Sequence, residues 1–228
     1  AFGNPISLYG YATITFNGKR IGTDRIYHGA GRNKILRDIC TPKFLQELFG
    51  RKTSLITIAI TMTFSILVTG LLWRLSLPDQ NWPLWQFITF CLLSVDISGG
   101  VIANLSQGTN HYYQESVKRR CIFLLIHIQP LLLALLFNQS LLTCTMVWLG
   151  AMIGALFVSE LLKDCREQAL TGASMAGLGC ILLISYSKLP ISMTALLSLY
   201  LIKLLFAFSV NHYTTACSNA VSYTHLTL

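Results

Sequence analysis

Charge is scarce in this sequence. Charged residues make up only 11% of the 228 residues, whereas a typical soluble domain has roughly 25%. Hydrophobic residues make up 53%, and the mean hydropathy is +0.57. This balance excludes a disordered chain, a coiled coil and an ordinary soluble enzyme. The class that remains is a polytopic membrane protein.

The sequence also lacks the usual signatures of metal sites and catalysis. Its seven cysteines form no CxxC pair and most lie in apolar runs, so we expect neither a disulfide framework nor a zinc site. The motifs HExxH, GxSxG and HxxxH do not occur. The sequence therefore predicts no cofactor and no metal, and it does not favour an enzyme.

Long apolar segments are what the sequence has in abundance. Crossing ~30 Å of hydrocarbon takes about 20 apolar residues in a helix. Residues 121–159 carry no charge and are too many for one helix, so we expect a tight hairpin at Asn138-Gln139-Ser140. The pattern predicts an all-α polytopic membrane protein with six transmembrane helices, at residues 54–73, 85–105, 121–137, 141–162, 169–186 and 191–210.

The first 53 residues differ from the six-helix domain predicted at 54–211. Alternating residues Ala12–Phe16 followed by Asn17-Gly18 indicate a β-hairpin. Thr41-Pro42 indicates a short helix, with Thr41 as N-cap and Pro42 at the first helical position. We expect this helix to lie on the membrane surface through the side chains of Phe44, Leu45, Leu48 and Phe49.

The end of the chain forms a tail at 212–228. Its last nine residues, Ala220 to Leu228, resemble a translated sequencing-adaptor run. This resemblance implies that the tail is partly artefactual.

The basic residues predict the orientation in the membrane. Of 17 Lys and Arg residues, nine precede residue 53, and further ones lie in the loops at 118–120 and 163–166. Only Arg74 and Lys188 fall on the opposite side. The positive-inside rule then places both termini in the cytoplasm of a cell-membrane protein. We expect the basic N-terminal segment to contact anionic lipid headgroups rather than nucleic acid.

Three ionisable residues fall inside predicted helices and at similar depth. Counted at ~1.5 Å per residue from the cytoplasmic ends, Asp96, His127 and Lys203 lie roughly 9–13 Å deep. Such residues are expensive to place in a membrane, so each is a functional-site hypothesis. Glu160 lies closer to the surface, where we expect it to pair with Lys163 or Arg166.

A polar stripe surrounds Asp96. Positions 96, 100, 103, 104, 107 and 111 share one face if the helix continues, and His127 is expected to face Asp96 from the next helix as its titrating partner. The polar residues nearby are expected to line an entrance from the cytoplasm. The candidate binding or coupling residues are Asp96, His127, Asn104, Gln107, Asn110, His111, Gln129 and Lys203.

This polar layer has three competing interpretations. The first is a buried Asp96–His127 or Asp96–Lys203 pair that fixes helix packing in a protein without chemistry. The second is an ion- or proton-coupled transport site for a small solute, with Asp96 as the proton or cation acceptor. The third is a membrane-embedded metal-dependent hydrolase that uses Asp96, His127, His111 and His212.

Small residues predict close helix packing elsewhere. Gly150 and Gly154 form a GxxxG pattern, and Ala169, Ala173 and Gly177 form a related series. Such seams let helices approach closely in lipid. We therefore expect residues 141–162 and 169–186 to pack on each other or on a second subunit of a homo-oligomer.

Residues 96–130 contain the pattern Asp-x-x-Gly-Gly, Ala-Asn, Thr-Asn-x-Tyr-Tyr and His-x-Gln-Pro. With this pattern the segment resembles a family of small uncharacterised bacterial multi-pass membrane proteins. The resemblance implies a bacterial inner-membrane protein whose function lies in the helices at 85–105 and 121–137 and in the loop between them. It implies no particular activity.

Overall fold

The computed structural model describes residues 11–16, 19–25, 38–76, 82–163 and 165–213. The chain divides into two compact units, residues 1–37 and 38–228. In the first unit, strand β1 (Tyr11–Phe16) pairs with strand β2 (Lys19–Arg25) in antiparallel fashion. The predicted β-hairpin is therefore confirmed. The adaptor-like run at 220–228 lies outside the described residues.

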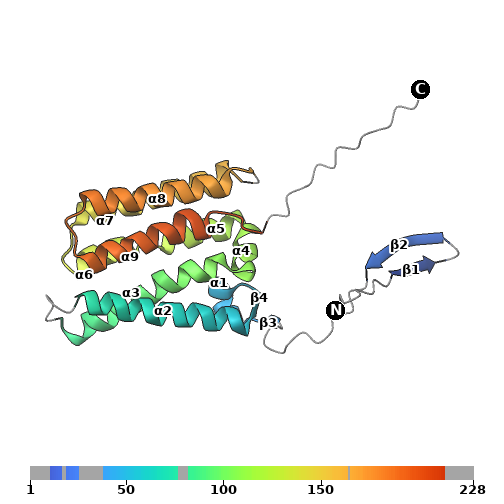
Figure 1. Cartoon of the computed structure of the whole chain (residues 1–228), viewed down its shortest axis with the longest axis horizontal. Coiled ribbons are helices and arrows are strands. Elements are labelled where there is room, and N and C mark those ends of the chain that lie inside the picture. Colours follow the sequence, from blue (N-terminus) through green and yellow to red (C-terminus); the bar gives the residue numbers. More distant parts are fainter. Residues whose placement is uncertain (1–10, 17–18, 26–37, 77–81, 164, 214–228) are drawn as a thin grey trace, which may run out of the picture. The chain divides into compact units, whose positions relative to one another are not determined.

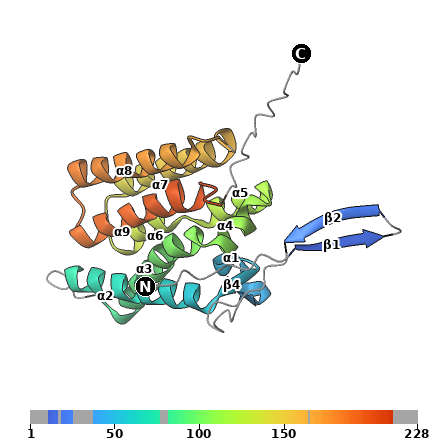
Figure 2. The same cartoon turned by 45° about the vertical axis from the view of Figure 1, so that its right-hand side comes forward.

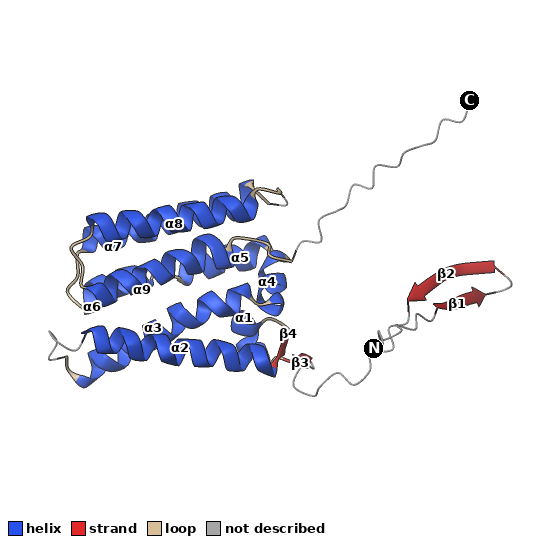
Figure 3. Cartoon of the chain, in the orientation of Figure 1, coloured by secondary structure: helices blue, strands red, loops and turns tan. Residues whose placement is uncertain are grey.

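Among its described residues, the second unit contains six helical spans that are long and apolar enough to cross a membrane. The all-α polytopic fold is thus confirmed, and Figures 1 and 3 show the spans running side by side. The spans are α2 (Leu55–Ser76), α3 (Leu84–Leu105), α5 (Val117–Ile126) with α6 (Gln129–Leu136), α7 (Leu141–Leu156) with η4 (Phe157–Leu161), α8 (Gln168–Tyr186), and α9 (Ile191–Ile202) with η5 (Lys203–Phe208).

The span formed by α9 and η5 lies at the centre of this bundle. It runs between α3 and α8 in the two views of Figures 1 and 2. Leu196, Tyr200 and Leu204 on this span are fully buried. The α8 span instead leaves most of its surface uncovered by protein. Residues on α9 and η5 are therefore the ones that can contact several other helices at once.

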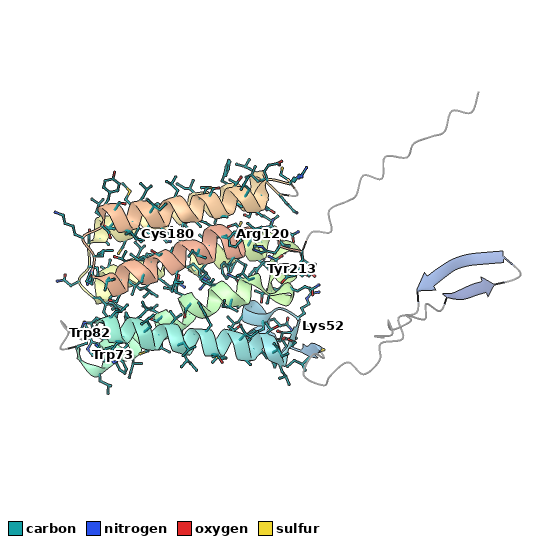
Figure 4. The ribbon with its side chains drawn as sticks, in the orientation of Figure 1. Lys52, Trp73, Trp82, Arg120, Cys180 and Tyr213 are labelled. Carbon is teal, nitrogen blue, oxygen red and sulfur yellow. The ribbon has the colours of Figure 1, made fainter. Side chains whose placement is uncertain are left out.

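The two ends of the bundle differ in character. Figure 4 shows Trp73 and Trp82 at one end and Lys52, Arg120 and Tyr213 at the other. At the aromatic end, the rings of Trp73 and Trp82 lie 6.0 Å apart and those of Trp82 and Phe137 lie 4.9 Å apart. We call the end with Trp73 and Trp82 the aromatic end, and the end with Lys52, Arg120 and Tyr213 the basic end. Successive spans run in alternating directions between them.

The predicted hairpin between two spans is confirmed. Asn138 adopts a positive φ of 50°, which asparagine tolerates better than most residues. The Gln139 backbone N–H donates to the Ala134 carbonyl at 3.0 Å. The Ser140 side chain accepts a hydrogen bond from the Thr143 backbone N–H and caps α7.

The short helix near residue 42 differs from its prediction. It begins as a 3₁₀ turn, η2 (Lys43–Leu45), and continues as α1 (Gln46–Phe49), with Pro42 rather than Thr41 as N-cap. Thr41 instead continues the strand before the helix, and its backbone N–H donates to the Arg51 carbonyl at 3.0 Å. That bond extends the pairing of strands β3 (Asp38–Cys40) and β4 (Lys52–Ser54).

This segment packs on the bundle, a contact that the expected position on the membrane surface did not include. Phe49 is buried, and the backbone of Gly50 presses against Gly108 in helix α4 (Gln107–Gln114). Gly50 has a φ of 71°, and a Cβ there would lie 2.0 Å from the Gly108 oxygen, so only glycine fits. The compact unit that contains the spans begins at Asp38, and the first span begins at Leu55, next to the predicted residue 54.

The small-residue seam of α7 and α8 is only partly used. A Cβ on Gly154 would meet Leu205 and Met175, so this glycine does allow close packing. Gly150 and Gly177 have no neighbouring atom within 4 Å of the Cβ position. The predicted packing of these two helices on each other is therefore found at Gly154, where Met175 of α8 is the neighbour, but among the described residues it does not extend to Gly150 or Gly177.

Candidate functional site

An ion pair between α3 and η5 forms the centre of the candidate site. The Lys203 ammonium contacts the Asp96 carboxylate, with 3.2 Å between Nζ and Oδ2, and donates to the Asp96 carbonyl at 3.1 Å. The sequence placed both residues in one layer of the membrane, and the contact confirms it. Of the two partners weighed for Asp96, the structure selects Lys203.

The two partners are buried to very different degrees. Only 2% of the Lys203 side chain is uncovered, whereas 47% of the Asp96 side chain is not covered by protein. The lysine is accommodated by Gly100, where a Cβ would lie 2.3 Å from Lys203 Cε. Glycine at this position therefore makes room for the lysine side chain.

Gln129 is the second partner of Asp96. Its Nε2 donates to Asp96 Oδ2 at 2.6 Å, and its Oε1 is buried without a hydrogen-bond partner in the described part of the chain. Both donors to the carboxylate use Oδ2, and Oδ1 accepts no bond from the described residues. Two acceptor atoms, Asp96 Oδ1 and Gln129 Oε1, are thus unused at this site.

Gln129 stands at a break in its span. Residues 127 and 128 leave the helical conformation, with ψ values of 59° and 14°, and α6 begins at Gln129. Pro130 has no N–H to continue the helical ladder, and the Ile126 carbonyl instead accepts from Ile128 at 3.0 Å. The prediction of one continuous helix at 121–137 is therefore corrected to two helices, α5 and α6.

His127 stabilises this break and does not pair with Asp96. Its Nδ1–H donates to the Phe123 carbonyl at 2.5 Å, and its own carbonyl accepts from the Tyr200 hydroxyl at 2.7 Å. Its ring packs on Phe123, with 3.8 Å between ring centroids. No hydrogen bond or ion pair joins His127 to Asp96 among the described residues, so the predicted direct contact is wrong.

The polar stripe below Asp96 does not continue on one helix. Ser106 adopts an extended backbone (ψ 146°), and its side chain bonds the Ala103 carbonyl and the Thr109 backbone N–H. A serine that can cap a helix favours a new start, and α4 begins at Gln107. The predicted loop at 106–120 therefore contains a helix that the sequence analysis missed.

The new helix start at Gln107 separates the four polar residues that were predicted to line an entrance, Asn104, Gln107, Asn110 and His111. Asn104 and Asn110 are buried, and Asn110 donates to the Val210 carbonyl at 2.8 Å. Gln107 and His111 are exposed, and the His111 ring stacks on Tyr213. None of the four bonds to Asp96, so they are not part of the Asp96 site.

Sequence reasoning missed a second buried ion pair. Arg120 is fully buried at the basic end, and its Nε and Nη2 contact Glu160 at 2.7 and 3.0 Å. Its Nη1 donates to the carbonyls of Tyr113 and Gln114. Glu160 was expected to pair with Lys163 or Arg166. The burial of Arg120 could have been predicted from its position one turn into a helix and directly before an apolar run.

The histidines proposed for a metal site do not gather around Asp96. His212 packs on Phe206, and its ring bonds the Phe206 carbonyl at 3.2 Å. Burial lowers the pKa of His212. Within the described residues, no three His, Cys, Asp or Glu side chains are close enough to hold a metal ion. The geometry thus gives no support to the hydrolase interpretation.

Comparison of the chain with models of protein families, with curated proteins and with solved structures found no match.

Proposed function

We propose that this chain is a multi-pass protein of the bacterial cell membrane with both termini in the cytoplasm. The basic end carries Lys52 and Arg120, together with the Lys163–Arg166 loop, and the aromatic end carries few basic residues. The positive-inside rule supports placing the basic end in the cytoplasm. Anionic headgroups of that leaflet would bind the basic residues near the N-terminal end of the first span.

Ion- or proton-coupled transport of a small solute is the function that the Asp96 site supports best. One observation carries this proposal: a carboxylate in the middle of a span has nearly half of its side chain uncovered, and one of its oxygens has no donor among the residues that the structure describes. An uncovered carboxylate in hydrocarbon is costly. A proton, a cation or the polar group of a solute bound at Oδ1 and at Gln129 Oε1 would remove that cost.

The surroundings of Asp96 allow such binding to change the structure. Lys203 begins η5, a π-helical segment, and Gln129 follows the break between α5 and α6. π-Helical turns and discontinuous spans recur at functional sites in membranes. Protonation of Asp96 removes the negative charge that holds buried Lys203, so the ammonium then gains by moving toward another acceptor. Binding at Asp96 is thereby coupled to the position of η5.

The experiment is proton flux into liposomes that contain the purified protein and an entrapped pH-sensitive dye. An inside-negative potential is imposed with potassium and valinomycin. We expect faster acidification than in protein-free liposomes, and we expect Asp96→Asn to abolish the difference. Glu160→Gln is the matched control, because it removes the acidic partner of the other buried pair and should retain flux.

Chemical labelling of Asp96 tests the proposal independently of the flux measurement. Dicyclohexylcarbodiimide reacts with protonated carboxyl groups in apolar surroundings. We expect one adduct on the unchanged protein by intact mass, less adduct as pH rises, and none on Asp96→Asn. Gly100→Ala, which displaces Lys203, should raise the yield. If Asp96 is unreactive and Asp96→Asn conducts protons like the unchanged protein, the pair is structural and the transport proposal fails.

A further inference from the structure

The helices α7 and α8 form a wedge-shaped opening. At the basic side of the wedge, a Cβ on Gly154 would lie 2.5 Å from Leu205 Cδ2 and 2.8 Å from Met175 Cε. Nearer the aromatic end, the Cβ position of Gly150 has no neighbour within 4 Å. The two helices therefore touch at one side and diverge toward the other.

A cavity of about 510 Å³ lies in the opening between α7 and α8. Its walls come from α7 and α8, and its floor comes from Leu201 and Leu205 of the central span. Most of its lining is apolar. The polar side chains in the lining, Thr143, Tyr186 and Ser187, all lie at the aromatic end. The cavity therefore has an apolar interior and a polar mouth at a membrane boundary.

The length of the cavity matches one leaflet of a bilayer. Along α8 it extends from Met175 to Tyr186, which at 1.5 Å per residue is about 16 Å. Half of the hydrocarbon thickness is about 15 Å. A partner helix would need a seam through the whole membrane, but the wedge closes at Gly154 and Met175.

The volume suits a small and narrow occupant. A volume of about 510 Å³ lies within the range of small-ligand sites. A flexible hydrocarbon chain is narrow enough for the wedge and needs no hydrogen-bond donor or acceptor in its interior.

We propose that this cavity binds one acyl chain of a diacyl phospholipid from the leaflet at the aromatic end. The chain lies between α7 and α8 on the floor formed by Leu201 and Leu205. The headgroup lies at Ser187 and at the exposed Lys188 that follows it, where the ammonium attracts the phosphate. This site is separate from Asp96 and does not depend on the transport proposal.

Two glycines allow a matched test. Gly150 lines the cavity and Gly177 does not, and both have open space at the Cβ position. Gly150→Leu should fill the cavity, whereas Gly177→Leu adds the same side chain to the lipid-facing surface. The delipidated proteins are titrated with 1-palmitoyl-2-oleoyl-phosphatidylglycerol in detergent, and bound lipid is counted by native mass spectrometry.

We expect one lipid bound to the unchanged protein and to Gly177→Leu, and at least tenfold weaker binding to Gly150→Leu. Gly150→Ala, the smaller change, should give an intermediate loss if the leucine variant does not fold. Lys188→Gln should reduce the preference for an anionic headgroup without abolishing binding. Equal binding by Gly150→Leu and Gly177→Leu overturns the proposal. A lipid-free dimer that becomes monomeric in Gly150→Leu also overturns it, in favour of a second copy.

Discussion

At the scale of single residues, Asp96 and Lys203 are unequal partners. Lys203 has almost no surface outside the protein, whereas nearly half of the Asp96 side chain is uncovered. A fully buried charge that loses its partner is left without compensation, whereas the Asp96 carboxylate keeps its hydrogen bond from Gln129 and can take up a proton. The two single substitutions should therefore differ in their cost, although both break the same ion pair.

We predict that Asp96→Asn lowers the free energy of unfolding by about 1–3 kcal/mol, the cost of leaving a buried polar group unsatisfied. Lys203→Met should cost less, because the carboxylate that it leaves behind keeps Gln129 as a donor and can be neutralised by a proton. The double variant should resemble Lys203→Met rather than the sum. The measurement is unfolding in detergent with increasing sodium dodecyl sulfate.

A surface ion pair provides the control for this comparison of the single and double variants. Glu115 pairs with Arg51 and Arg119, and nearly half of its side chain is exposed. Glu115→Gln should change stability by less than ~1 kcal/mol. Equal and additive effects of Asp96→Asn and Lys203→Met would show that the burial difference has no energetic consequence.

At the scale of helices, hydroxyl caps decide where elements begin. Serine precedes α4, α5 and α7, and in each case its side-chain oxygen accepts a backbone N–H three residues later. At α4 the cap turns the chain out of the direction of α3. This change separates Gln107 and His111 from Asp96, so one serine determines which residues can belong to the site.

Ser106→Ala should lower stability by about 1 kcal/mol, the typical cost of losing an N-cap. Ser106→Thr keeps the hydroxyl and should retain most of the stability that Ser106→Ala loses. Ser185→Ala, at an exposed position on α8, is the control and should have little effect. Thermal unfolding in detergent measures all three, and an unchanged midpoint for Ser106→Ala would contradict the capping role.

At the scale of the whole molecule, the separation of basic and aromatic ends predicts the orientation. Cys165 and Lys188 are exposed at opposite ends of the bundle. Two proteins with a single cysteine are therefore made from a cysteine-free variant, one with Cys165 restored and one with Lys188→Cys. Intact cells are then treated with a membrane-impermeant maleimide. Lys188→Cys should be labelled at once, and Cys165 only after permeabilisation. The reverse pattern would refute cytoplasmic termini.

The sequence by itself determined the six spans, the alternation of their directions and the Asn138 hairpin. These features depend on local quantities. Hydrocarbon thickness sets the length of each apolar run, and a polar break in such a run has to lie at the membrane surface. The depth shared by Asp96 and Lys203 follows from the same counting, because residues advance along a helix at a fixed rise.

Only the tertiary structure decided which groups meet within that layer. Lys203 lies 107 residues from Asp96 in the chain, and their contact depends on how each helix is rotated and on the space that Gly100 leaves. The break at His127 places Gln129 rather than the histidine against the carboxylate. Local pattern carries no information on helix rotation or on the separation of distant segments. For that reason the sequence narrowed the partner of Asp96 to His127 or Lys203 without choosing between them, and it did not predict the opening between α7 and α8.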